Sequence, residues 1–327
     1  MVITRTPFRI SFFGGGTDYP VWYMNNGNGG MTISTTINRY CYITARHLPP
    51  FFDHKYRIRY TRREERSAIE NIEHPSVREC MKYLDFRDHL EMVHTSDLPA
   101  MAGLGSSSAF TVGFLNSLHG LRGKTVRPRD LALQAIHVEQ NLIGENVGSQ
   151  DQVATAVGGL NRIVFRPSGI KISSLSLSPR TLKTLEGRLL LYFTGFQRFA
   201  SEIAAEQIKN TPDKTQELNA MMHLAKRAEA DLLAGSIGNM GALLDEGWQI
   251  KKTLSSKITD NRIDAIYARA RSAGAVGGKL LGAGGGGFFL LYAPEQKHAK
   301  IRAALSDLIH VPFHFENTGS KIIYQNI

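Results

Sequence analysis

The segment from Asp97 to Ser108 (DLPAMAGLGSSS) constrains this chain more than any other part of the sequence. Its small residues and glycines lead directly into a helical pattern, in which one face carries the apolar residues Ala109, Phe110, Phe114 and Leu118. A helix that begins after a glycine turn presents free backbone N–H groups, which bind anions. A plain serine N-cap would need only one hydroxyl. The three successive serines therefore favour a phosphate site, where they would donate to phosphate or hold Mg²⁺.

Two other segments that resemble phosphate loops fail on their context. Gly123-Lys124-Thr125 has the end of a P-loop, but Leu118 stands where that motif needs its first glycine. The glycine run 282–287 fits the dinucleotide pattern G-x-G-x-x-G, yet an apolar strand follows it where a helix is required. Such a run still indicates a close backbone approach, either to a ligand or to a second loop.

The composition limits the class of protein. Of the 327 residues, 39 are Lys or Arg and 29 are Asp or Glu, so the net charge is +10. A basic chain suggests anionic partners such as nucleic acid, acidic lipid or phosphorylated small molecules. The 42% hydrophobic and 21% charged residues exclude disorder, collagen and coiled coil. Two cysteines make no disulfide framework. Since no signal peptide or membrane span stands out, we expect a soluble, cytoplasmic protein without a membrane partner.

Strand and helix patterns follow one another without a strict βαβ repeat. Phe8, Ile10 and Phe12 alternate with Arg9 and Ser11, which predicts a half-buried strand. Further strands are expected at 31–46, 160–165, 188–193 and 288–292, and helices from 106, at 129–142 and within 215–255. The arginine-rich segment 57–66 is predicted to be a solvated strand and turn rather than a binding patch. Together these patterns predict an α+β fold with a weak boundary between 174 and 184.

Three separated segments resemble the three sequence motifs of the GHMP small-molecule kinases. They are residues 7–19 (PFRISFFGGGTDY), 99–108 (PAMAGLGSSS) and 279–287 (KLLGAGGGG), in the family's order and spacing. The resemblance implies an ATP-binding N-terminal domain, residues 1–182, similar to the second domain of ribosomal protein S5. It also implies a ferredoxin-like C-terminal domain, residues 183–327. ATP and the substrate would meet in the cleft between the two domains.

The resemblance also assigns the residues that would bind ATP and transfer its phosphoryl group. The ATP phosphates would contact Pro99, Gly103, Leu104, Gly105, Ser106, Ser107 and Ser108. Asp151 matches the family's catalytic aspartate, which accepts a proton from the attacking hydroxyl or orients it. Arg9 matches the basic partner of that aspartate and would stabilise charge in the transition state. From the residues alone, a helix-capping aspartate and an exposed strand arginine are the alternatives.

Magnesium is the metal that the resemblance implies. Mg²⁺ prefers oxygen ligands and keeps several waters. Ser107 matches the family's serine ligand, and Glu139 is the candidate carboxylate. Glu139 lies twelve residues before Asp151, one more than the spacing expected from mevalonate kinase. A glutamate on a surface helix is the alternative reading of this position.

Three segments are similar to the D-glycero-D-manno-heptose phosphate kinases within this family: residues 12–18, 148–152 and 194–201 (TGFQRFAS), the last followed by Glu206-Gln207. Galactokinases have Glu-His at Gly15-Gly16, so a galactose pocket is not expected. The resemblance implies phosphorylation of the anomeric hydroxyl of D-glycero-D-manno-heptose 7-phosphate, in nucleotide-activated heptose synthesis. Substrate contacts are expected from Gly15, Gly16, Thr17, Asp18, Thr194, Arg198, Ser201, Gly284 and Gly285.

Two of these assignments have their own chemical reasons. Asp18 can accept hydrogen bonds from two adjacent sugar hydroxyls, although an Asx-turn after the glycines is the simpler reading. Arg198, with the hydroxyls of Thr194 and Ser201, would hold the second phosphate, because a guanidinium binds phosphate through two parallel hydrogen bonds. A solvent-exposed helix arginine is the alternative.

Other functions remain open at this stage. The same chemistry on fucose or an N-acetylhexosamine is one alternative. A non-catalytic sensor of sugar or nucleotide, or an RNA binder, is another. RNA binding would require aromatic residues interleaved with a basic stripe, whereas only Tyr56 and Tyr60 accompany the arginines of 57–66. We therefore expect a sugar phosphate as the partner and no nucleic acid, and a homodimer is left open.

Overall fold

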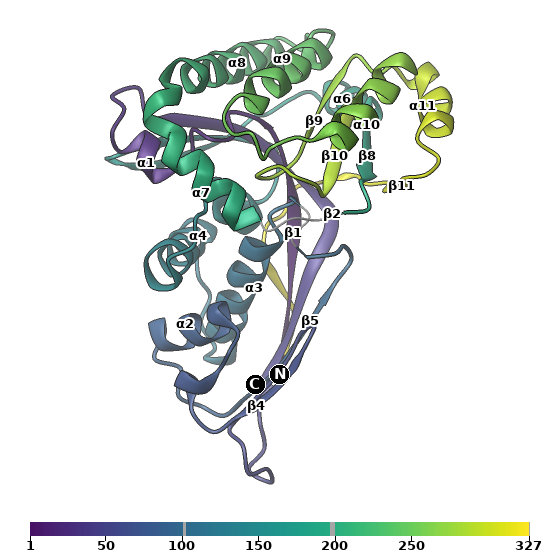
Figure 1. Cartoon of the computed structure of the whole chain (residues 1–327). Helices are drawn as coiled ribbons and strands as arrows, with labels where there is room; N and C mark the ends of the chain where they lie inside the picture. Colours follow the sequence, from purple (N-terminus) through teal and green to yellow (C-terminus); the bar gives the residue numbers. More distant parts are fainter. Residues whose placement is uncertain (101–102, 197–199, 327) are drawn as a thin grey trace.

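The computed structural model describes residues 1–100, 103–196 and 200–326, and the side chains of these residues except those of Ala200 and Ser201. Two sheets organise the chain, one large and one small (Figure 1). Long strands of the large sheet run from the lower tip of the molecule up to the small sheet and its helices. The prediction of an α+β fold is confirmed.

The large sheet has nine strands, with the order β13-β1-β2-β5-β3-β4 along its main path. Strands β6 and β12 also pair with β2, and β7 pairs with β6. All pairs are antiparallel except that of β3 with β5. The strands are β1 (Val2–Phe13), β2 (Gly30–His47), β3 (Tyr56–Arg59), β4 (Arg63–Arg66), β5 (Leu90–Ser96), β6 (Asn161–Arg166), β7 (Gly169–Ser174), β12 (Phe315–Glu316) and β13 (Lys321–Gln325).

The small sheet has the order β11-β8-β10-β9, and its pairs are antiparallel. Its apolar strands give the buried core of this part of the molecule, as the sequence RLLLYF and FFLLY predicted. The strands are β8 (Leu189–Phe193), β9 (Gly277–Leu280), β10 (Phe288–Tyr292) and β11 (Ile309–His310).

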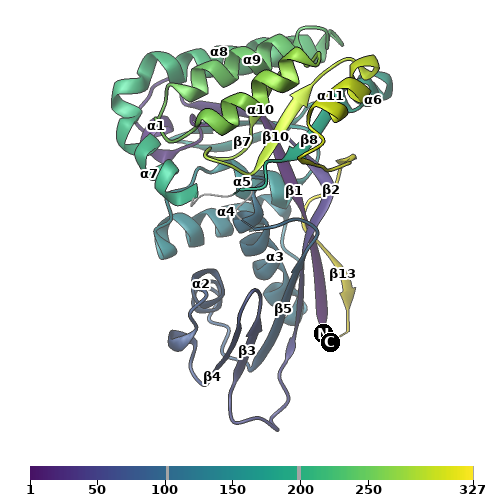
Figure 2. The ribbon, with the colours of Figure 1, turned by 45° about the vertical axis from the view of Figure 1, so that its right-hand side comes forward.

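The helices fall into two groups along the chain, and the second group, at the top in Figure 2, packs on both sheets, since α8 contacts β1 and β2 while α9 contacts β9 and β10. The first group is α1 (Pro20–Tyr23), α2 (Pro75–Tyr83), α3 (Ser106–Leu121), α4 (Pro128–His137) and α5 (Gln150–Val157). The second is α6 (Pro179–Gly187), α7 (Ala200–Asn210), α8 (Thr215–Leu233), α9 (Met240–Lys252), α10 (Asn261–Ser272) and α11 (His298–Ala304). A π-helix, Val138–Ile143, extends α4, and short 3-10 helices span Ile69–Asn71, Thr211–Lys214 and Glu295–Lys297. Among the described residues, no helix is both long and apolar enough to span a membrane.

Strand β1 is buried on both faces, so the prediction of a half-buried strand there was wrong. Helices α3 and α5 contact it, and so do α8 and α9 from the second group. Gly113 lets α3 approach β1 closely, because a Cβ at this position would lie 2.8 Å from Thr6 Oγ1. The consequence for Arg9 is that its side chain is only 3% exposed, instead of pointing to solvent.

The arginine-rich segment 57–66 forms the hairpin β3-β4, as predicted. Its arginines pair with nearby glutamates: Arg57 with Glu65 and Glu91, and Arg63 with Glu65. These ion pairs engage the arginine side chains with acceptors of the same fold. They favour the structural reading of this segment over a nucleic-acid patch.

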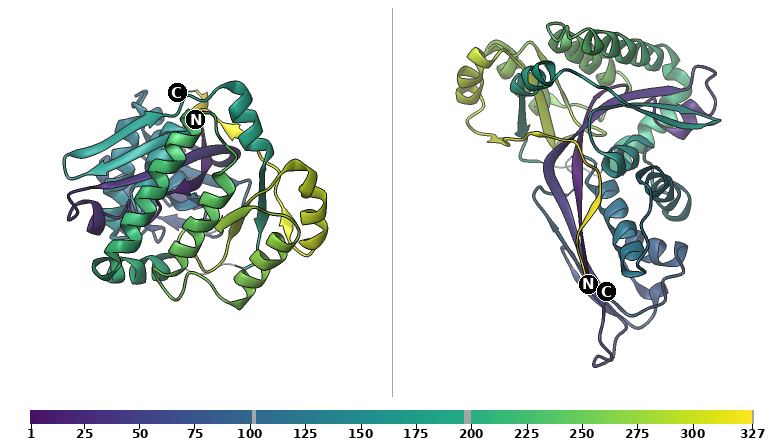
Figure 3. Two further views of the ribbon diagram at one scale, coloured as in Figure 1. Left: turned by 90° about the horizontal axis from the view of Figure 1, so that it is seen from above. Right: turned by 180° about the vertical axis from the view of Figure 1, so that it is seen from behind.

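The end of the chain returns to the large sheet. β12 pairs with β2 and β13 with β1, so the two termini lie side by side (Figure 3). The predicted domain division at residue 182 falls inside α6. The division into 1–182 and 183–327 stays a prediction, and the pairing of β13 shows that the last residues pack with the first part of the chain.

Candidate active site

A cavity of about 510 Å³ lies between elements from the first part of the chain and elements from its second part. Its wall combines β1, the turn after β1 and the start of α3 with α5 from the first part of the chain. Helices α7 and α9, strand β9 and the glycine loop after it contribute from the second part of the chain, and residues just after β3, at the start of α2, in β5 and in the segment 145–148 also line the cavity. The cavity is therefore built from segments that are more than two hundred residues apart in the sequence.

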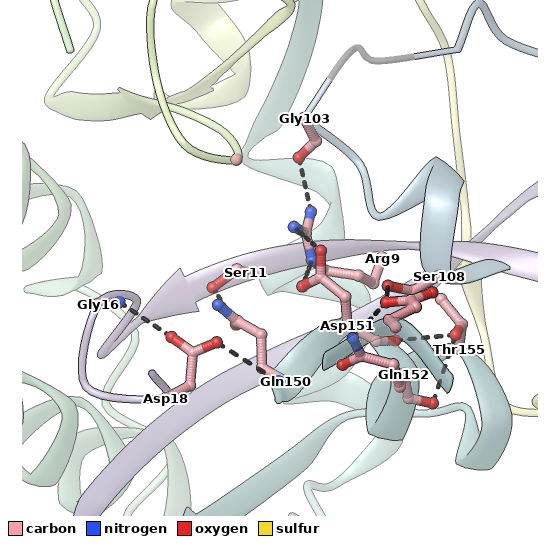
Figure 4. A network of polar contacts seen from close by, with 12 residues as sticks. Arg9, Ser11, Gly16, Asp18, Gly103, Ser108, Gln150, Asp151, Gln152 and Thr155 are labelled. Atoms are coloured by element: carbon pink, nitrogen blue, oxygen red, sulfur yellow. Dashed lines mark hydrogen bonds and ion pairs between the residues drawn. The ribbon is translucent and has the colours of Figure 1, made fainter. Parts of the chain in front are cut away.

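Arg9 and Asp151 meet in this cavity through two parallel hydrogen bonds (Figure 4). Arg9 Nε donates to Asp151 Oδ1 and Nη2 donates to Oδ2, each at 2.7 Å. Arg9 is buried, whereas the Asp151 side chain is 26% exposed. The carboxylate is thus held from one side and remains open to the cavity on the other. This geometry suits a group that receives or orients a hydroxyl.

Arg9 also fastens the loop that precedes α3. Its Nη1 donates to the carbonyl of Gly103 at 2.6 Å, and its backbone N–H donates to the carbonyl of Leu104 at 3.0 Å. Gly105 then takes a left-handed conformation, with φ of 76°, and a Cβ there would lie 3.1 Å from Arg9 Cγ. Glycine is required at this turn both for its conformation and for the close approach.

The helix α3 begins at Ser106, directly after that turn. Ser106, Ser107 and Ser108 all line the cavity, together with Gly103 and Gly105. The free N–H groups and the dipole of this 16-residue helix face the same space. Pro99 and Leu104 lie outside the cavity wall formed by the described residues; Leu104 is buried and acts through its carbonyl.

The glycine loop 282–287 packs against the phosphate-loop candidate. A Cβ on Gly282 would lie 2.4 Å from the Cα of Gly103, so the two loops touch through bare backbone. Within the described residues, Gly284 and Gly285 do not reach the cavity wall. A Cβ on Gly284 would lie 2.7 Å from Ile258 Cα, and Gly285 N donates to the carbonyl of Ile258. Loop-to-loop packing, one of the two readings of the run, thus accounts for both.

The other predicted substrate contacts in this region are Thr194, Arg198 and Ser201, and of these the structure describes the side chain of Thr194 alone. Thr194 is buried, and its hydroxyl donates to the carbonyl of Gly287 at 2.9 Å. That bond fastens the glycine loop to the end of β8, outside the cavity wall of the described residues. Arg198 lies outside the described residues. Ser201 is in α7, and its side chain is likewise not described.

The turn after β1 holds Asp18 in the cavity. The carboxylate accepts hydrogen bonds from the backbone N–H of Gly16 at 3.0 Å and of Gln150 at 3.3 Å. Burial, and next the negative charge of Asp151, raise the pKa of Asp18 to about 6. Gly15 and Gly16 line the cavity beside it. Thr17 is buried, and its hydroxyl donates to the Gly14 carbonyl at 2.7 Å, which holds the turn.

Glu139 is fully buried at the start of the π-helix Val138–Ile143. Its Oε2 accepts hydrogen bonds from Ser108 Oγ at 2.9 Å and from Gln152 Nε2. Burial raises the pKa of Glu139 to about 8, and the charge of Glu145 adds to the shift. A π-helical turn holds about one residue more than an α-helical turn, which is the size of the departure in spacing between Glu139 and Asp151.

Of the two serines that could hold a metal with Glu139, Ser108 and not the predicted Ser107 bonds to the glutamate among the described contacts. Ser108 contacts the glutamate, whereas Ser107 is exposed. The reason is helical geometry, since successive residues of α3 point about 100° apart. The direct contact therefore joins Ser108 with Glu139, and the assignment of Ser107 to a metal stays a prediction.

Glu139 is not among the residues that line the cavity, but its partner Ser108 is, so a Mg²⁺ held by this pair would lie at the cavity wall. Gln152 Oε1 is a buried oxygen atom that lacks a hydrogen-bond partner among the described residues, and Glu139 Oε1 has none of ordinary geometry, although the Thr111 hydroxyl interacts with this carboxylate. Orphaned buried oxygens are unfavourable unless a cation or water satisfies them. A hard cation would accept these ligands with water and phosphate oxygens. No cluster of three His, Cys, Asp or Glu side chains suits a metal in the described part of the chain, so phosphate would have to complete the coordination.

One end of the cavity is aromatic, which the sequence motifs did not indicate. His74 stacks on Phe110 with ring centroids 4.6 Å apart, and Tyr60 and His94 contact these rings edge-on. All four line the cavity. Burial lowers the pKa of His74 to about 4, so its ring is neutral near pH 7. Two buried lysines, Lys251 and Lys279, were also missed, and they line the same cavity.

Two domains of a known protein family match parts of this chain. The N terminal domain of GHMP kinases matches residues 73–159, and the C terminal domain of GHMP kinases matches residues 228–310. The chain is 26% identical to the D-glycero-alpha-D-manno-heptose 7-phosphate kinase of Campylobacter jejuni, over 97% of each chain. It is 29% identical to the mevalonate kinase of Thermococcus sibiricus, over 64% of this chain and 62% of that one.

Solved structures share the whole fold. A D-glycero-D-manno-heptose 1-phosphate kinase from Bacteroides thetaiotaomicron superimposes with a TM-score of 0.81, at 21% identity and with all of each chain covered. Lactococcus lactis galactokinase in complex with galactose gives 0.75 at 17% identity, over 98% of this chain and 94% of that one. The two matched domains together span more than half of the 327 residues. The chain belongs to the GHMP kinase family.

Proposed function

We propose that this GHMP kinase transfers the γ-phosphoryl group of ATP to the anomeric hydroxyl of D-glycero-D-manno-heptose 7-phosphate, giving the 1,7-bisphosphate for nucleotide-activated heptose synthesis. The observation that carries the proposal is the Arg9–Asp151 pair, which shares one cavity with Asp18 and the start of α3. The choice of sugar is supported by the full-length similarity to a relative named as a heptose 7-phosphate kinase.

In this proposal Asp151 orients the attacking hydroxyl and receives its proton. The bond from the sugar oxygen to the γ-phosphorus forms as the bond to the β,γ-bridging oxygen breaks, which releases ADP. Arg9 holds Asp151 in place through two hydrogen bonds and adds positive charge where negative charge spreads. The N–H groups at the start of α3 bind the phosphates of ATP, with hydroxyls from Ser106, Ser107 and Ser108 beside them.

Asp18 binds the sugar. Its carboxylate accepts hydrogen bonds from two sugar hydroxyls, which take the place of some of the contacts that now bury it. Gly15 and Gly16 lie alongside. The second phosphate of the substrate is assigned, as in the sequence-based prediction, to the segment that holds Thr194, Arg198 and Ser201. Because the Thr194 hydroxyl already bonds to Gly287, Arg198 and Ser201 carry this assignment.

ATP and Mg²⁺ are the cofactors that the family implies. Glu139 and Ser108 would hold Mg²⁺, with Ser107 as the predicted alternative, and the ion would neutralise charge on the transferred phosphoryl group. The adenine ring would stack in the aromatic end formed by Tyr60, His74, His94 and Phe110. Neutral aromatic side chains bind a planar base by stacking, which does not depend on charge.

An ADP-release assay with a panel of sugars tests this proposal. The wild type is expected to turn over D-glycero-D-manno-heptose 7-phosphate in the presence of ATP and Mg²⁺, whereas Asp151→Asn loses about 10² to 10⁴ in kcat. The matched control is Asp130→Asn, which changes an exposed carboxylate in α4 that pairs with Arg127. Turnover of fucose or an N-acetylhexosamine alone would keep the chemistry and discard the heptose.

The non-catalytic alternatives have less support. A sensor would not need the bidentate Arg9–Asp151 pair, and the arginines of 57–66 that an RNA binder would use pair with nearby glutamates. ATP binding without ADP release from any sugar would restore the sensor reading. The homodimer stays a prediction.

A further inference from the structure

Lys251 and Lys279 line the active-site cavity, and the phosphoryl transfer described above uses neither of them. Lys251 is in the last turn of α9 and Lys279 is in β9. They are 7% and 5% exposed, although lysine side chains are almost never buried without a partner. Removing an ammonium group from water is unfavourable unless an anion or several acceptors compensate. The buried position of both residues therefore needs a reason.

The hydrogen bonds of the two ammonium groups supply only part of that compensation. Lys279 Nζ donates to the carbonyl of Phe12 at 2.9 Å, and Lys251 Nζ donates to the carbonyls of Leu280, at 3.0 Å, and Gly282. All three acceptors are neutral. An ammonium group has three N–H donors. Among the described residues, each lysine thus keeps at least one donor without an acceptor.

The charges nearby do not balance. The groups that act on Lys251 are the cations Lys279 and Arg9 and the single carboxylate Asp18. Arg9 and Asp18 likewise act on Lys279. Because Arg9 is already paired with Asp151, Asp18 is the one carboxylate near the two lysines, and it balances at most one of them in the charged form. Burial, and next the charge of Arg9, lower the pKa of Lys279 to about 7, and burial lowers the pKa of Lys251 well below its ordinary value.

We propose that Lys251 and Lys279 form a phosphoryl-binding site on the α9-β9 side of the cavity, separate from the site at the start of α3. A phosphate group would supply the missing negative charge and accept the free N–H donors. The inference deepens the proposed function and rests on it, since that function supplies two phosphoryl groups. One is the γ-phosphate of ATP, and the other is the phosphate already on the sugar.

The backbone partners of the lysines connect the site to both phosphoryl groups, that of ATP and that of the sugar. Lys251 bonds to Gly282, which packs on Gly103 in the loop assigned to the ATP phosphates. Lys279 bonds to Phe12, one residue before the end of the strand that leads into the turn with Asp18. The shared chemistry is a phosphate dianion held by two ammonium groups, and the experiment below separates the two sources.

Titration calorimetry with the full chain and Mg²⁺ tests the site. The probes are ADP, β,γ-imido-ATP and D-glycero-D-manno-heptose 7-phosphate, each applied to Lys251→Met and Lys279→Met. Methionine keeps the length of the side chain and removes the charge. Lys252→Met is the matched control, because it is the next residue of α9 and its ammonium group lies 3.5 Å from Asp264, in a half-buried pair. Where a Met variant does not fold, Lys→Gln replaces it.

At least one of the two Lys→Met variants is expected to bind imido-ATP or the heptose phosphate about tenfold more weakly or worse, the usual loss for a charged hydrogen bond. Binding of ADP should stay within about twofold of the wild type, as in Lys252→Met, since ADP lacks the transferred group. A loss confined to imido-ATP assigns the site to the γ-phosphate. A loss confined to the heptose phosphate assigns it to the phosphate of the sugar.

Two results would overturn the site. Wild-type affinity for every probe would show that the lysines only fasten the loops. An equal loss for ADP and imido-ATP would show that their removal disturbs the whole cavity. If the wild type binds no heptose 7-phosphate, the proposed substrate is wrong, and the comparison of ADP with imido-ATP then decides the lysine site alone.

Discussion

The guanidinium of Arg9 joins the carboxylate of Asp151 to the backbone of Gly103, with two bonds of 2.7 Å to the one and a bond of 2.6 Å to the other. A single buried side chain therefore fixes both the candidate base and the loop before α3 (Figure 4). The three groups come from strand β1, helix α5 and the loop after β5. If the phosphates of ATP bind that loop, Arg9 sets the position of the attacking sugar hydroxyl relative to the γ-phosphorus.

Substitution of Arg9 by lysine tests this double role. Lysine keeps the charge but cannot make two parallel bonds to a carboxylate while also reaching Gly103. We expect kcat to fall by about 10² or more, while the KM for ATP changes little. Arg5→Lys on the same strand is the control, because Arg5 makes a looser pair with Glu316 at 3.7 Å. An Arg9→Lys enzyme with wild-type kcat would show that the positive charge alone suffices.

Substitution of Gly148 by alanine should displace Asp18. A Cβ at this position would lie 1.9 Å from Asp18 Oδ2, so the carboxylate has to move. We expect the KM for the sugar to rise about tenfold or more, with ATP binding unchanged, because a misplaced contact loses its orientation. Gly238→Ala is the matched control, since nothing lies within 4 Å of its Cβ position. Steady-state kinetics with varied sugar measures the effect, and an unchanged KM would argue against a sugar contact at Asp18.

The pKa of Asp18, raised to about 6 by burial, predicts a pH dependence of sugar binding. Above pH 6 the group is an ionised acceptor for hydroxyls, and below pH 6 it is protonated. The KM for the sugar should therefore rise as pH falls from 7 to 5, by up to about tenfold per unit once the group is protonated. Asp18→Asn should bind the sugar weakly and lack this rise. The same pH profile in Asp18→Asn and wild type would assign the titration to another group.

Glu139 predicts how stability changes with pH in the absence of Mg²⁺. Its pKa is about 8 in the folded chain and 4.5 without burial, so the folded state keeps a proton that the unfolded state has lost between these values. The folded state binds more protons, and the free energy of unfolding therefore falls as pH rises from about 4.5 to about 8. Relative to wild type, Glu139→Gln should gain on the order of 1 kcal/mol per pH unit within this window.

Thermal unfolding measured from pH 5 to pH 8 checks the prediction. The Tm of Glu139→Gln minus that of the wild type should grow with pH, and saturating Mg²⁺ with ADP should reduce the difference, since the ion and the phosphates together bind the folded wild type. Glu246→Gln, which changes a half-exposed carboxylate paired with Arg227, should show no such trend. A difference in Tm that is constant with pH, or unaffected by Mg²⁺ with ADP, would contradict the assignment of Glu139 to a metal.

The local elements of this fold were predictable from the sequence, because their signals are local. The start of α3 after Gly105, the strand β1 and the hairpin β3-β4 follow from periodicity and turn residues. The burial of Arg9 was not predictable. The alternation of a strand tells which residues share a face, but not what packs against that face. Asp151 of α5 and the loop at Gly103, which lie far from Arg9 in the sequence, cover its side chain.

The candidate site was predictable where a motif carries it and not where tertiary contacts create it. Ser108 rather than Ser107 meets Glu139, because the rotation of α3 and the π-helix decide which hydroxyl faces the carboxylate. Lys251, in the last turn of α9, is typical of a surface cation near a helix C-terminus. His74 and Phe110 come together from separate elements, so no spacing in the sequence signals their stacking.

Phosphorus NMR of the reaction product tests the central claim most directly. The wild type, given ATP, Mg²⁺ and D-glycero-D-manno-heptose 7-phosphate, is expected to form one new phosphate ester on the anomeric carbon, with one ADP released per ester. Asp151→Asn should form it about 10² to 10⁴ times more slowly, and Asp130→Asn at the wild-type rate. A phosphate on any other hydroxyl, or equal rates for Asp151→Asn and wild type, would contradict the assignment of the substrate or of the Arg9–Asp151 pair.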